Sequence, residues 1–583
     1  MAGEKERLFG ATYSNRQVLG GFWKLARPYW FSEERWSGRG LLALVVGLNL
    51  GWVYLLVWLN TWYRNFYDAL QKFQARLFWH LLLEFCGVAA VAILVAVFRQ
   101  FFSQTLRNRW RLWMTRRFLG DWLSDKSHYL WRLTDTKTDN PDQRISEDIR
   151  DFVDNSLGLS VGLLNQVVTL FSFIAILWTL SGPLAIPLGG GRSLSVPGYM
   201  AWACLVYAGV ATWLTHRIGR PLIPLNFRQQ ELEANFRFGL VRLRENGEGV
   251  ALSEGEAVEE RDLKGHFQWV FSNMRSIIRK QMHLGFFTSA YDQAAVVFPF
   301  MVAAPRYFAK VIGFGGLLQI SNAFDRVRTA LSWVVENYSA LAYWRSVVER
   351  LEGFEDEVER TKSMRARAAS LLHEAPRGGS IRLRGVSLSL PGEGRALTSA
   401  LDAEFRPGRS VLISGPSGCG KSTLLRALRG LWPFATGSFD LPAGDPVMVL
   451  PQKPYLPVGT LKAALAYPEA EEGVTDGEAA EVLELCRLDH LKPALHAADN
   501  WALVLSVGEQ QRVAWARVFL RGPKWIFLDE ATSALDEDAQ ERLYRGLKER
   551  LPGTTMVSVA HAQNPRERHQ AVWELSAGGA GAH

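Results

Sequence analysis

A glycine-rich stretch in the last third of the chain has the residue types and spacing that bind phosphate. Its nine residues are Gly415, Pro416, Ser417, Gly418, Cys419, Gly420, Lys421, Ser422 and Thr423, and they read G-x-x-x-x-G-K-S. Backbone N–H groups of such a loop close around a polyphosphate, the lysine reaches the terminal phosphates, and the serine hydroxyl can hold Mg²⁺. We therefore predict that Lys421 binds phosphate and that Ser422 is a magnesium ligand.

The elements around this loop must present it at the end of a buried strand. Residues 411–413 before the loop are apolar, as in a buried parallel strand, and residues 424–428 after it read as a helix. The positive end of that helix dipole then faces the phosphates. A second apolar run, 525–528, ends in two carboxylates. We predict that Asp529 orients Mg²⁺ and that Glu530, one residue further, polarises the attacking water.

Further motifs accompany these carboxylates. They are Gln452, the segment 505–512 (Leu-Ser-Val-Gly-Glu-Gln-Gln-Arg), the segment 533–536 (Ser-Ala-Leu-Asp), and His561. In this order the set resembles the nucleotide-binding domain of ATP-binding cassette (ABC) proteins, over roughly residues 381–575. The resemblance implies that ATP is the nucleotide and that Gln452 is a further Mg²⁺ ligand. It implies that Ser506 and Gly508 contact the γ-phosphate bound to the opposite subunit, that Asp536 belongs to the D-loop, and that His561 holds the γ-phosphate and Glu530 in place.

The chain departs from the ABC pattern at two places. The signature has Val507 where the family usually has glycine, and Glu509 where it usually has glutamine. A carboxylate adds negative charge beside a phosphate, so we expect that of Glu509 to point elsewhere, with Gln510 as the neighbouring candidate to replace the amide. The second departure is the aromatic residue that usually stacks on adenine, because residues 388–392 contain none.

The first 345 residues differ from the rest in composition. They contain long apolar runs and most of the 22 tryptophans of the 583-residue chain. A helix needs about 20 apolar residues to cross a bilayer. We predict six spans on this basis, at roughly 41–63, 77–98, 158–180, 198–218, 283–304 and 312–335.

The distribution of cations predicts the orientation of these spans. The segments 99–157 and 219–282 carry many Arg and Lys residues, whereas the three alternate loops carry few. By the positive-inside rule both termini and the phosphate loop are cytoplasmic. A thiol at Cys419 fits a reducing cytosol, and four scattered cysteines argue against a disulfide framework. Membrane-facing cations account for the net charge of +8, so no nucleic-acid partner is expected.

The predicted fold is a membrane all-α six-helix domain of the exporter-type ABC fold, fused to an α/β phosphate-loop nucleotide-binding domain. Residues 1–40 form an interfacial amphipathic segment, 41–351 the membrane domain, 352–380 a linker, and 381–583 the ATP-binding domain. The two cation-rich segments are mostly helix-compatible. We expect them to extend the membrane helices toward the ATPase and to turn through short helices that contact it, with one helix starting near Asn140 and Pro141.

Several segments of the membrane half are similar to the YddA-like and SbmA/BacA-type bacterial permeases with a fused ATPase. They are residues 22–30, 59–71, 140–145 and 323–354. Parts of the ATPase half, 430–433 and 509–512, also occur in peroxisomal acyl-CoA half-transporters. The resemblance implies a homodimer with the exporter-type fold, and substrates that range from peptides and cobalamin to fatty acyl conjugates.

Two carboxylates, Glu84 and Asp292, lie within the predicted spans. Burying charge in lipid is costly, so such residues usually face the interior of a helix bundle. One interpretation is a cavity that attracts a polar or cationic substrate. The other is a structural pair with an arginine, or a position near the interface, and the sequence favours neither.

Together these features predict a homodimeric, ATP-driven transporter in the bacterial inner membrane, which requires ATP and Mg²⁺ and moves a polar or amphipathic solute such as a peptide or cobalamin. A lipid or acyl-CoA exporter or flippase on the same scaffold is the alternative, and a membrane ATPase that acts as a sensor without transport is a third. The six spans exclude a soluble ABC ATPase.

Overall fold

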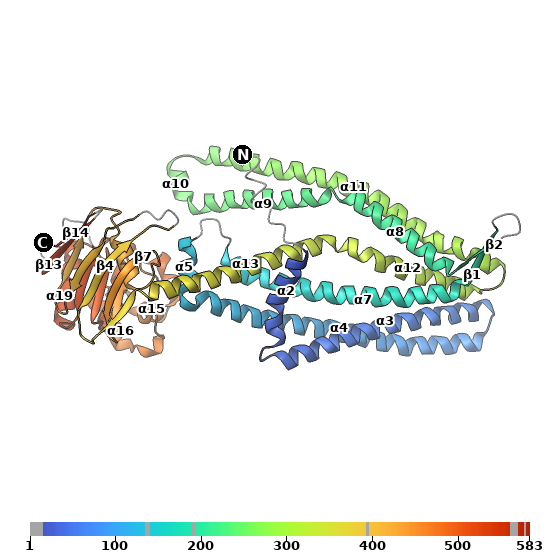
Figure 1. Cartoon of the computed structure of the whole chain (residues 1–583), viewed down its shortest axis with the longest axis horizontal. Helices are drawn as coiled ribbons and strands as arrows, with labels where there is room; N and C mark the ends of the chain where they lie inside the picture. The colour runs from blue at the N-terminus through green and yellow to red at the C-terminus, as the bar shows by residue number, and fades with distance from the viewer. Residues whose placement is uncertain are drawn as a thin grey trace. The chain divides into compact units, whose positions relative to one another are not determined.

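The computed structural model describes residues 15–134, 140–187, 193–391, 396–559, 569–576 and 579–582. Internal contacts divide the chain into two compact units. The helical unit comprises residues 1–118 and 140–354, and the α/β unit comprises residues 119–139 and 355–583 (Figure 1).

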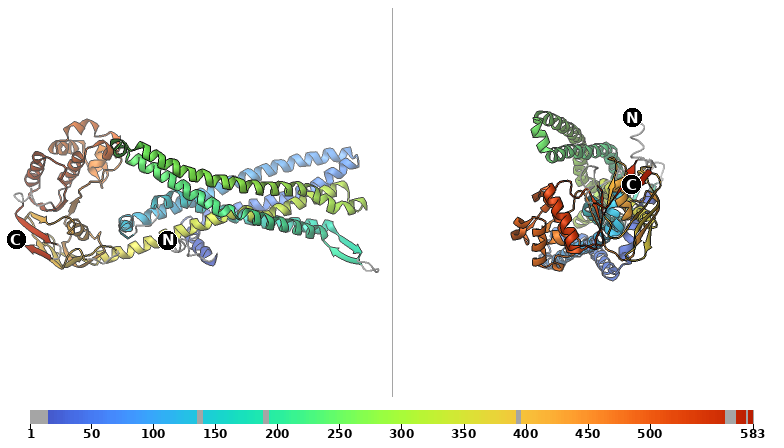
Figure 2. Two further views of the ribbon diagram at one scale, coloured as in Figure 1. Left: turned by 90° about the horizontal axis from the view of Figure 1, so that it is seen from above. Right: turned by 90° about the vertical axis from the view of Figure 1, so that its left-hand side faces the viewer.

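Helices, most of them long, make up most of the helical unit, and the long ones run side by side over much of their length (Figure 2). They are α2 (Asn15–Trp30), α3 (Arg35–Gln71), α4 (Ala75–Leu123), α7 (Ile149–Ser181), α8 (Tyr199–Gly219), α9 (Leu222–Glu245), α10 (Gly247–Leu252), α11 (Glu256–Phe308), α12 (Phe314–Glu336) and α13 (Tyr338–Ala369). The last residues of α4 and α13 belong to the α/β unit. A short hairpin of β1 (Pro183–Pro187) and β2 (Ser193–Pro197) joins α7 to α8.

Each of the six predicted spans coincides with one of these helices, although the spans 198–218 and 312–335 begin one and two residues before α8 and α12. Three helical stretches, Arg35–Gln71, Ala75–Leu133 and Pro141–Ser181, are long and apolar enough to cross a membrane by length and composition. The other three predicted spans lie in α8, α11 and α12. The presence of membrane-spanning helices is thus supported, and the number six stays a prediction.

Helix α12 lies at the centre of the helical unit, where it packs against α3, α7, α8 and α11. Its buried side chains, among them Ile320, Phe324 and Val327, meet Phe173 of α7 and Met200 of α8 in one apolar cluster. In a membrane, where lipid is as apolar as these side chains, van der Waals packing of this kind holds neighbouring helices together.

Helix α2 lies within the predicted interfacial segment 1–40 and is amphipathic. Leu25, Ala26 and Tyr29 are fully buried, whereas Trp23 is 53% exposed. The Tyr29 ring stacks on that of Trp110 in α4, with the ring centroids 5.6 Å apart. The buried face of α2 therefore packs on the helix bundle, and its exposed face presents apolar surface, as an interfacial helix would.

The α/β unit contains two larger sheets. A six-stranded, mostly parallel sheet has the order β14-β13-β6-β12-β11-β8, and a four-stranded sheet has the order β3-β7-β4-β5. The strands of the first are β6 (Val411–Ser414), β8 (Val447–Leu450), β11 (Trp525–Asp529), β12 (Thr555–Val559), β13 (Ala571–Ser576) and β14 (Gly579–Ala582). Those of the second are β3 (Leu372–Ala375), β4 (Ile381–Leu388), β5 (Leu401–Phe405) and β7 (Ala435–Pro442).

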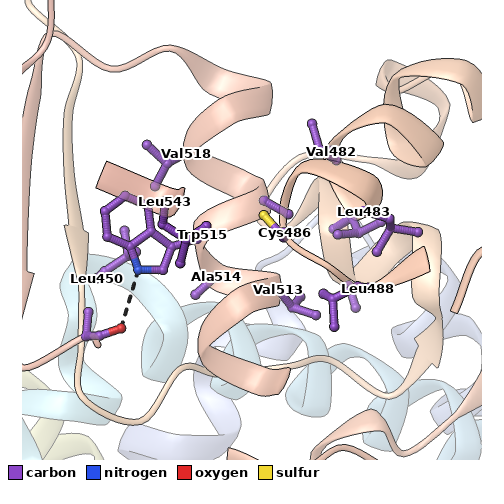
Figure 3. Packing of buried hydrophobic residues seen from close by; sticks show 14 of the residues in the cluster. Leu450, Val482, Leu483, Cys486, Leu488, Val513, Ala514, Trp515, Val518 and Leu543 are labelled. Carbon is purple, nitrogen blue, oxygen red and sulfur yellow. Dashed lines mark hydrogen bonds between the residues drawn. The ribbon is translucent and has the colours of Figure 1, made fainter. Parts of the chain in front are cut away.

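Two apolar cores stabilise this unit. One joins β4, β5 and β7 to the strands of the six-stranded sheet and to α14 (Lys421–Leu428). The other lies among α15 (Leu461–Ala466), α16 (Asp476–Leu485), α18 (Val507–Arg521) and α19 (Glu537–Arg550). Its centre is the fully buried Trp515, whose indole N–H donates to the carbonyl oxygen of Ala531 at 3.4 Å (Figure 3). The first core supports α14, which follows the phosphate loop, and the second supports the signature helix α18.

The α/β unit also includes residues 119–139, from the first cation-rich segment. There α5 (Ser127–Thr134) lies beside α14, and Leu133 packs against the core of the sheets. The expected contact between this segment and the ATPase is present. The predicted linker 352–380 is partly regular structure: α13 continues to Ala369, and β3 joins the four-stranded sheet. Helix α6 (Pro141–Gln143) begins after Asn140, where a helix start was expected.

Candidate functional site

The phosphate loop joins β6 to α14, as the sequence predicts. Gly418 and Gly420 have φ values of +80° and +100°, a region that favours glycine. A Cβ atom on Gly415 would lie 2.2 Å from the carbonyl oxygen of Leu575, so only glycine fits there. The Lys421 side chain is buried and donates to the carbonyl oxygens of Gly415 at 2.7 Å and Pro416 at 2.8 Å. The loop therefore holds this ammonium within a cradle of backbone groups.

Ser422 and Asp529 meet beside the loop. The hydroxyl of Ser422 donates to Oδ1 of Asp529 at 2.7 Å, because the first residues of α14 and the end of β11 lie at the same edge of the sheet. Among the described residues, no group of three His, Cys, Asp or Glu side chains gathers to hold a metal alone. One hydroxyl and one carboxylate nevertheless suit Mg²⁺, which keeps several waters and takes phosphate oxygens as further ligands.

Gln452 and Glu530 form the second pair of this site. The amide nitrogen of Gln452 donates to Oε2 of Glu530 at 2.9 Å. Glu530 has a φ of +52°, uncommon for a residue other than glycine, and its backbone N–H donates to the carbonyl oxygen of Val559. The backbone turns sharply after Asp529, so two adjacent carboxylates have different partners. Such strain at a chemically active position is typical of functional sites.

Gln511 connects the signature helix to both neighbouring motifs, a role that the sequence did not predict. Its amide nitrogen donates to the carbonyl oxygen of Gln452 at 3.0 Å, and its amide oxygen accepts from the backbone N–H of Ala534 at 3.2 Å. The side chain is 1% exposed. The sequence offered one signal for this role: Gln511 is a polar residue on a helix face that otherwise carries apolar residues.

The signature loop begins α18. Ser506 is the N-cap of this helix, and Val507 is exposed. A Cβ atom on Gly508 would lie 3.0 Å from the carbonyl oxygen of Ala534, so a glycine allows the close approach of the D-loop. Glu509 turns its carboxylate back to Ser506 at the start of the helix, and its expected orientation away from a phosphate stays a prediction. Gln510 does not replace it, because Gln510 is buried and donates to the carbonyl oxygens of Ala502 and Leu505.

Asp536, His561 and the missing adenine-stacking aromatic are the remaining features predicted from the sequence. Asp536 caps α19, where its side chain accepts from the backbone N–H of Ala539 at 2.6 Å. This is a structural role in addition to the predicted D-loop role. His561 lies outside the described residues, so its predicted contact with Glu530 stays a prediction. Residues 388–391 offer no aromatic ring for adenine, and 392–395 are outside the described residues.

A cavity of about 580 Å³ lies between the α5 segment and α14, and it extends to Ser422 and Asp529. Lys126, Arg426 and Arg429 are among the residues that line it. Burial and the neighbouring Arg365 and Arg429 lower the pKa of Lys126, and burial and Arg365 lower the pKa of Arg429. The ammonium of Lys126 also lies 3.5 Å from the carbonyl oxygen of Arg429. A segment from the cation-rich stretch thus contacts the helix that follows the phosphate loop.

In the helical unit, the two predicted carboxylates have different surroundings. Asp292 pairs with Arg328 of α12, with Oδ1 and Nη1 2.6 Å apart, and Arg328 also pairs with Asp325 at 2.9 Å. Glu84 is exposed on the surface of α4, and it pairs with no residue that the structure describes. The structure of a single chain therefore does not bring Glu84 and Asp292 into one site.

An apolar cavity of about 710 Å³ lies between α8 and α11. Tyr207, Tyr291 and Phe298 form one side of it, and the ring of Tyr207 stacks on the other two. The guanidinium of Arg328 lies 5.5 Å from the centre of the Tyr291 ring. An apolar space therefore borders a cluster of three charged side chains.

Two protein families match this chain, one in the helical part and one in the α/β part. Residues 25–308 match the family "ABC transporter transmembrane region 2", and residues 398–533 match the family "ABC transporter". The inner membrane ABC transporter ATP-binding protein YddA of Escherichia coli is 31% identical, over 96% of this chain and 97% of its own length. The chain belongs to the ABC transporter family. It is an exporter-type half-transporter, with one membrane domain and one ATP-binding domain in the same polypeptide.

Other relatives agree with this assignment, and a solved structure shares the fold. The chloroplastic ABC transporter D family member 2 of Arabidopsis thaliana is 31% identical, over 95% of this chain and 86% of its own. The human lysosomal cobalamin transporter ABCD4 is 27% identical, over 83% and 82%. A bacterial Atm1-family ABC exporter with ATP bound has the same fold, with a TM-score of 0.71 at 17% identity, over 93% of this chain and 95% of that one.

The half-transporter therefore binds ATP and couples its hydrolysis to transport from within a membrane. The described residues around the phosphate loop supply the parts that phosphoryl transfer needs. Lys421 contributes a buried positive charge, Ser422 and Asp529 offer oxygen ligands, and Glu530 offers a carboxylate positioned by Gln452. Catalysis of this reaction is mostly positioning and charge stabilisation.

Proposed function

We propose that this half-transporter works as a homodimer in the bacterial inner membrane and moves an amphipathic or polar solute, such as a peptide or cobalamin, at the expense of ATP. The observation that carries the ATPase part is the pair of contacts Ser422–Asp529 and Gln452–Glu530 beside one phosphate loop. Both termini and the ATPase face the cytoplasm in this proposal, as the cation distribution predicts.

In the proposed dimer, two copies pair head to tail. Each ATP lies between the phosphate loop of one copy and the signature of the other, so that Ser506 and Gly508 contact the γ-phosphate bound to the partner. Ser506 and Val507 are on the exposed surface of a single chain, which leaves them accessible to a second copy. Mg²⁺ is held by Ser422, Gln452 and Asp529, Glu530 is the general base, and His561 holds the γ-phosphate and Glu530.

The charged cluster and the apolar cavity of the helical unit support an amphipathic solute. Arg328, Asp292 and Asp325 can bind polar groups, and the cavity beside Tyr291 can bind an apolar part of the same molecule. Asp292 is 59% exposed in its side chain, so its pairing with Arg328 leaves an oxygen available. Glu84 is proposed to join the pathway only in the dimer.

A lipid or acyl-CoA substrate is the second candidate. The apolar wall of the cavity between α8 and α11 favours it, because an acyl chain needs an apolar space of this kind. The charged cluster favours the peptide or cobalamin candidate, because an acyl chain has no polar group that paired charges inside a membrane could bind.

Reconstitution in lipid nanodiscs separates these candidates. ATPase activity is measured with a peptide, cobalamin and an acyl-CoA, and with Asp292→Asn beside the wild-type chain. We expect a peptide or cobalamin to raise the rate and Asp292→Asn to abolish the increase while basal hydrolysis continues. Stimulation by acyl-CoA alone, unchanged in Asp292→Asn, would establish the second candidate instead.

A further inference from the structure

The signature loop contains a carboxylate where the ABC family usually has an amide, and this carboxylate has a complete set of partners. Oε2 of Glu509 accepts from the backbone N–H of Ser506 at 2.9 Å and from its hydroxyl at 2.8 Å. The backbone N–H of Glu509 lies 3.4 Å from the Ser506 hydroxyl oxygen. Together these contacts form a capping box at the start of α18.

The second oxygen of the same carboxylate is held from another element. Nε2 of His490 lies 2.9 Å from Oε1 of Glu509. A carboxylate only accepts, so this ring nitrogen carries the hydrogen. His490 belongs to the short helix η4 (Asp489–Ala494). Its position is fixed because Leu488 and Leu491 on either side of it are buried in the helical core of the α/β unit.

The turn that carries His490 is also tied directly to the signature helix. The guanidinium of Arg512, one turn after Glu509, donates to the carbonyl oxygen of Arg487 at 2.8 Å. Arg487 has a φ of +54°, so the backbone there is held in a conformation that only a few non-glycine residues adopt. Two separate contacts therefore join the signature helix to the segment 487–490.

These contacts explain how a negative charge is accommodated at the signature. Burial alone would raise the pKa of Glu509, but hydrogen bonds from Ser506 and His490 outweigh burial and lower it. The carboxylate is thus ionised at neutral pH, with both oxygens turned toward its own chain. Charge-assisted hydrogen bonds are stronger than neutral ones, and a negative charge at a helix N-terminus is stabilising.

We infer that Glu509 is a positioning residue for the signature serine, and that His490 holds Glu509 in the orientation that this requires. The inference rests on the proposed head-to-tail dimer, in which Ser506 contacts the ATP of the partner. Glu509 fixes the backbone of Ser506 and keeps its hydroxyl at the start of the helix. The Ser506 hydroxyl can then donate to a phosphate oxygen instead of to Glu509. Glu509 still accepts a hydrogen bond from the backbone N–H of Ser506 and still contacts His490.

The test compares variants of this arrangement with matched controls on the same unit. Glu509→Ala removes the capping box, Glu509→Gln keeps an acceptor without the charge, and His490→Ala removes the outer contact. Glu478→Ala is the first control, because Thr475 and Glu478 form the same capping box on α16. His496→Ala is the second, because His496 pairs with Asp476 at 3.0 Å and is exposed to a similar degree as His490.

Steady-state ATPase of the full chain in nanodiscs is the main measurement, with binding of a fluorescent ADP analogue as the second. Loss of a helix cap typically shifts a local equilibrium about fivefold. We expect Glu509→Ala to lower kcat about fivefold to tenfold, His490→Ala about twofold to fivefold, and Glu509→Gln to recover most of the rate. ADP binding to the phosphate loop and the melting temperature stay near the wild-type values, and both controls keep the wild-type rate.

Unchanged kcat in both Glu509→Ala and His490→Ala would overturn the inference, and so would an equal loss in Glu478→Ala. If Glu509→Ala fails to fold, His490→Ala alone decides the matter. Ser506→Ala separates this inference from the proposed dimer. A normal rate in Ser506→Ala would refute the shared site itself, whereas an inactive Ser506→Ala beside an active Glu509→Ala would refute only the positioning role.

Discussion

Ser422 and Asp529 are 107 positions apart in the chain, yet the serine hydroxyl donates to the aspartate carboxylate at 2.7 Å. The contact joins the first turn of the helix after the phosphate loop to the end of a central strand. It places a hydroxyl and a carboxylate beside the loop that holds Lys421. The chemistry of the site therefore depends on the register between α14 and β11.

Magnesium dependence tests this pair. Asp529→Asn keeps the shape and the hydrogen bond to Ser422 but removes the charge that attracts Mg²⁺. We expect ATPase to fall by at least about a hundredfold, in keeping with the loss of a preorganised electrostatic contact. The concentration of Mg²⁺ for half-maximal activity should rise in a titration. A wild-type Mg²⁺ curve for Asp529→Asn would show that this carboxylate is not a ligand.

Variants at Glu530 and Lys421 should lose ATPase activity for different reasons. Glu530→Gln removes the base but keeps an acceptor for Gln452, so we expect ATP binding to persist while hydrolysis is nearly lost. Lys421→Ala removes the buried ammonium, so nucleotide binding itself should weaken. Equilibrium binding of a fluorescent ATP analogue and steady-state ATPase distinguish the two. Hydrolysis at near the wild-type rate in Glu530→Gln would mean that another group activates the water.

Substitution at Gly415 tests the close approach of the phosphate loop to the backbone of Leu575. A Cβ atom there would lie 2.2 Å from the carbonyl oxygen of Leu575, which is backbone and cannot rotate away. We expect Gly415→Ala to lower both the melting temperature and the affinity for nucleotide. Gly477→Ala is the control, because a Cβ at Gly477 meets nothing within 4 Å and the residue lies in helix α16. Equal melting temperatures for the two variants would contradict this expectation.

Cys486 should be protected from maleimide in the folded chain. Burial raises the pKa of Cys486 to about 12, so at pH 8 only on the order of one thiol in ten thousand is ionised. Cys419 is also buried, at 4% exposure, so both thiols of the α/β unit are shielded. Mass spectrometry of the folded chain should find no modification at Cys486, whereas the chain unfolded in denaturant should be modified there. Rapid modification of Cys486 without unfolding would contradict the packing of the helical core.

The basic cavity beside α5 predicts unequal lysine reactivity. Burial and nearby arginines lower the pKa of Lys126, whereas a hydrogen bond from Lys492 to Glu484 raises the pKa of Lys492. A lower pKa leaves more neutral amine at pH 8, and the neutral amine is the nucleophile. Acetylation by an activated ester, followed by mass spectrometry, should therefore modify Lys126 before Lys492. The reverse order would show that Lys126 is not crowded by Arg365 and Arg429.

Local motifs were predictable from the sequence because their chemistry depends on spacing along the chain. The phosphate loop lies between the expected strand and helix, and Asp529 ends the strand formed by the second apolar run. The contacts that orient these groups were not predictable. His490 meets Glu509, Gln511 meets Gln452, and no periodicity or motif reports on pairs of that kind.

The membrane half shows the same limit. Hydropathy located helical segments, and the positions of Glu84 and Asp292 within them were plain from the sequence. The arginine that pairs with Asp292 lies 36 residues away on another helix, so the partner emerged only from the packing of α11 against α12. A carboxylate in a predicted span indicates that a partner or a cavity exists, but the choice between them depends on the neighbouring helices.

A mixed dimer tests the shared ATP sites, which are the centre of the proposed mechanism. One chain carries Lys421→Ala, the other carries Ser506→Ala, and both carry Glu530→Gln so that bound ATP is retained. If each site combines one chain's phosphate loop with its partner's signature, both defects fall in the same site and the other site stays intact. Gel filtration with radiolabelled ATP should then recover about one nucleotide per mixed dimer, and close to none from a homodimer in which every chain carries all three changes. Close to none from the mixed dimer as well would contradict the head-to-tail arrangement.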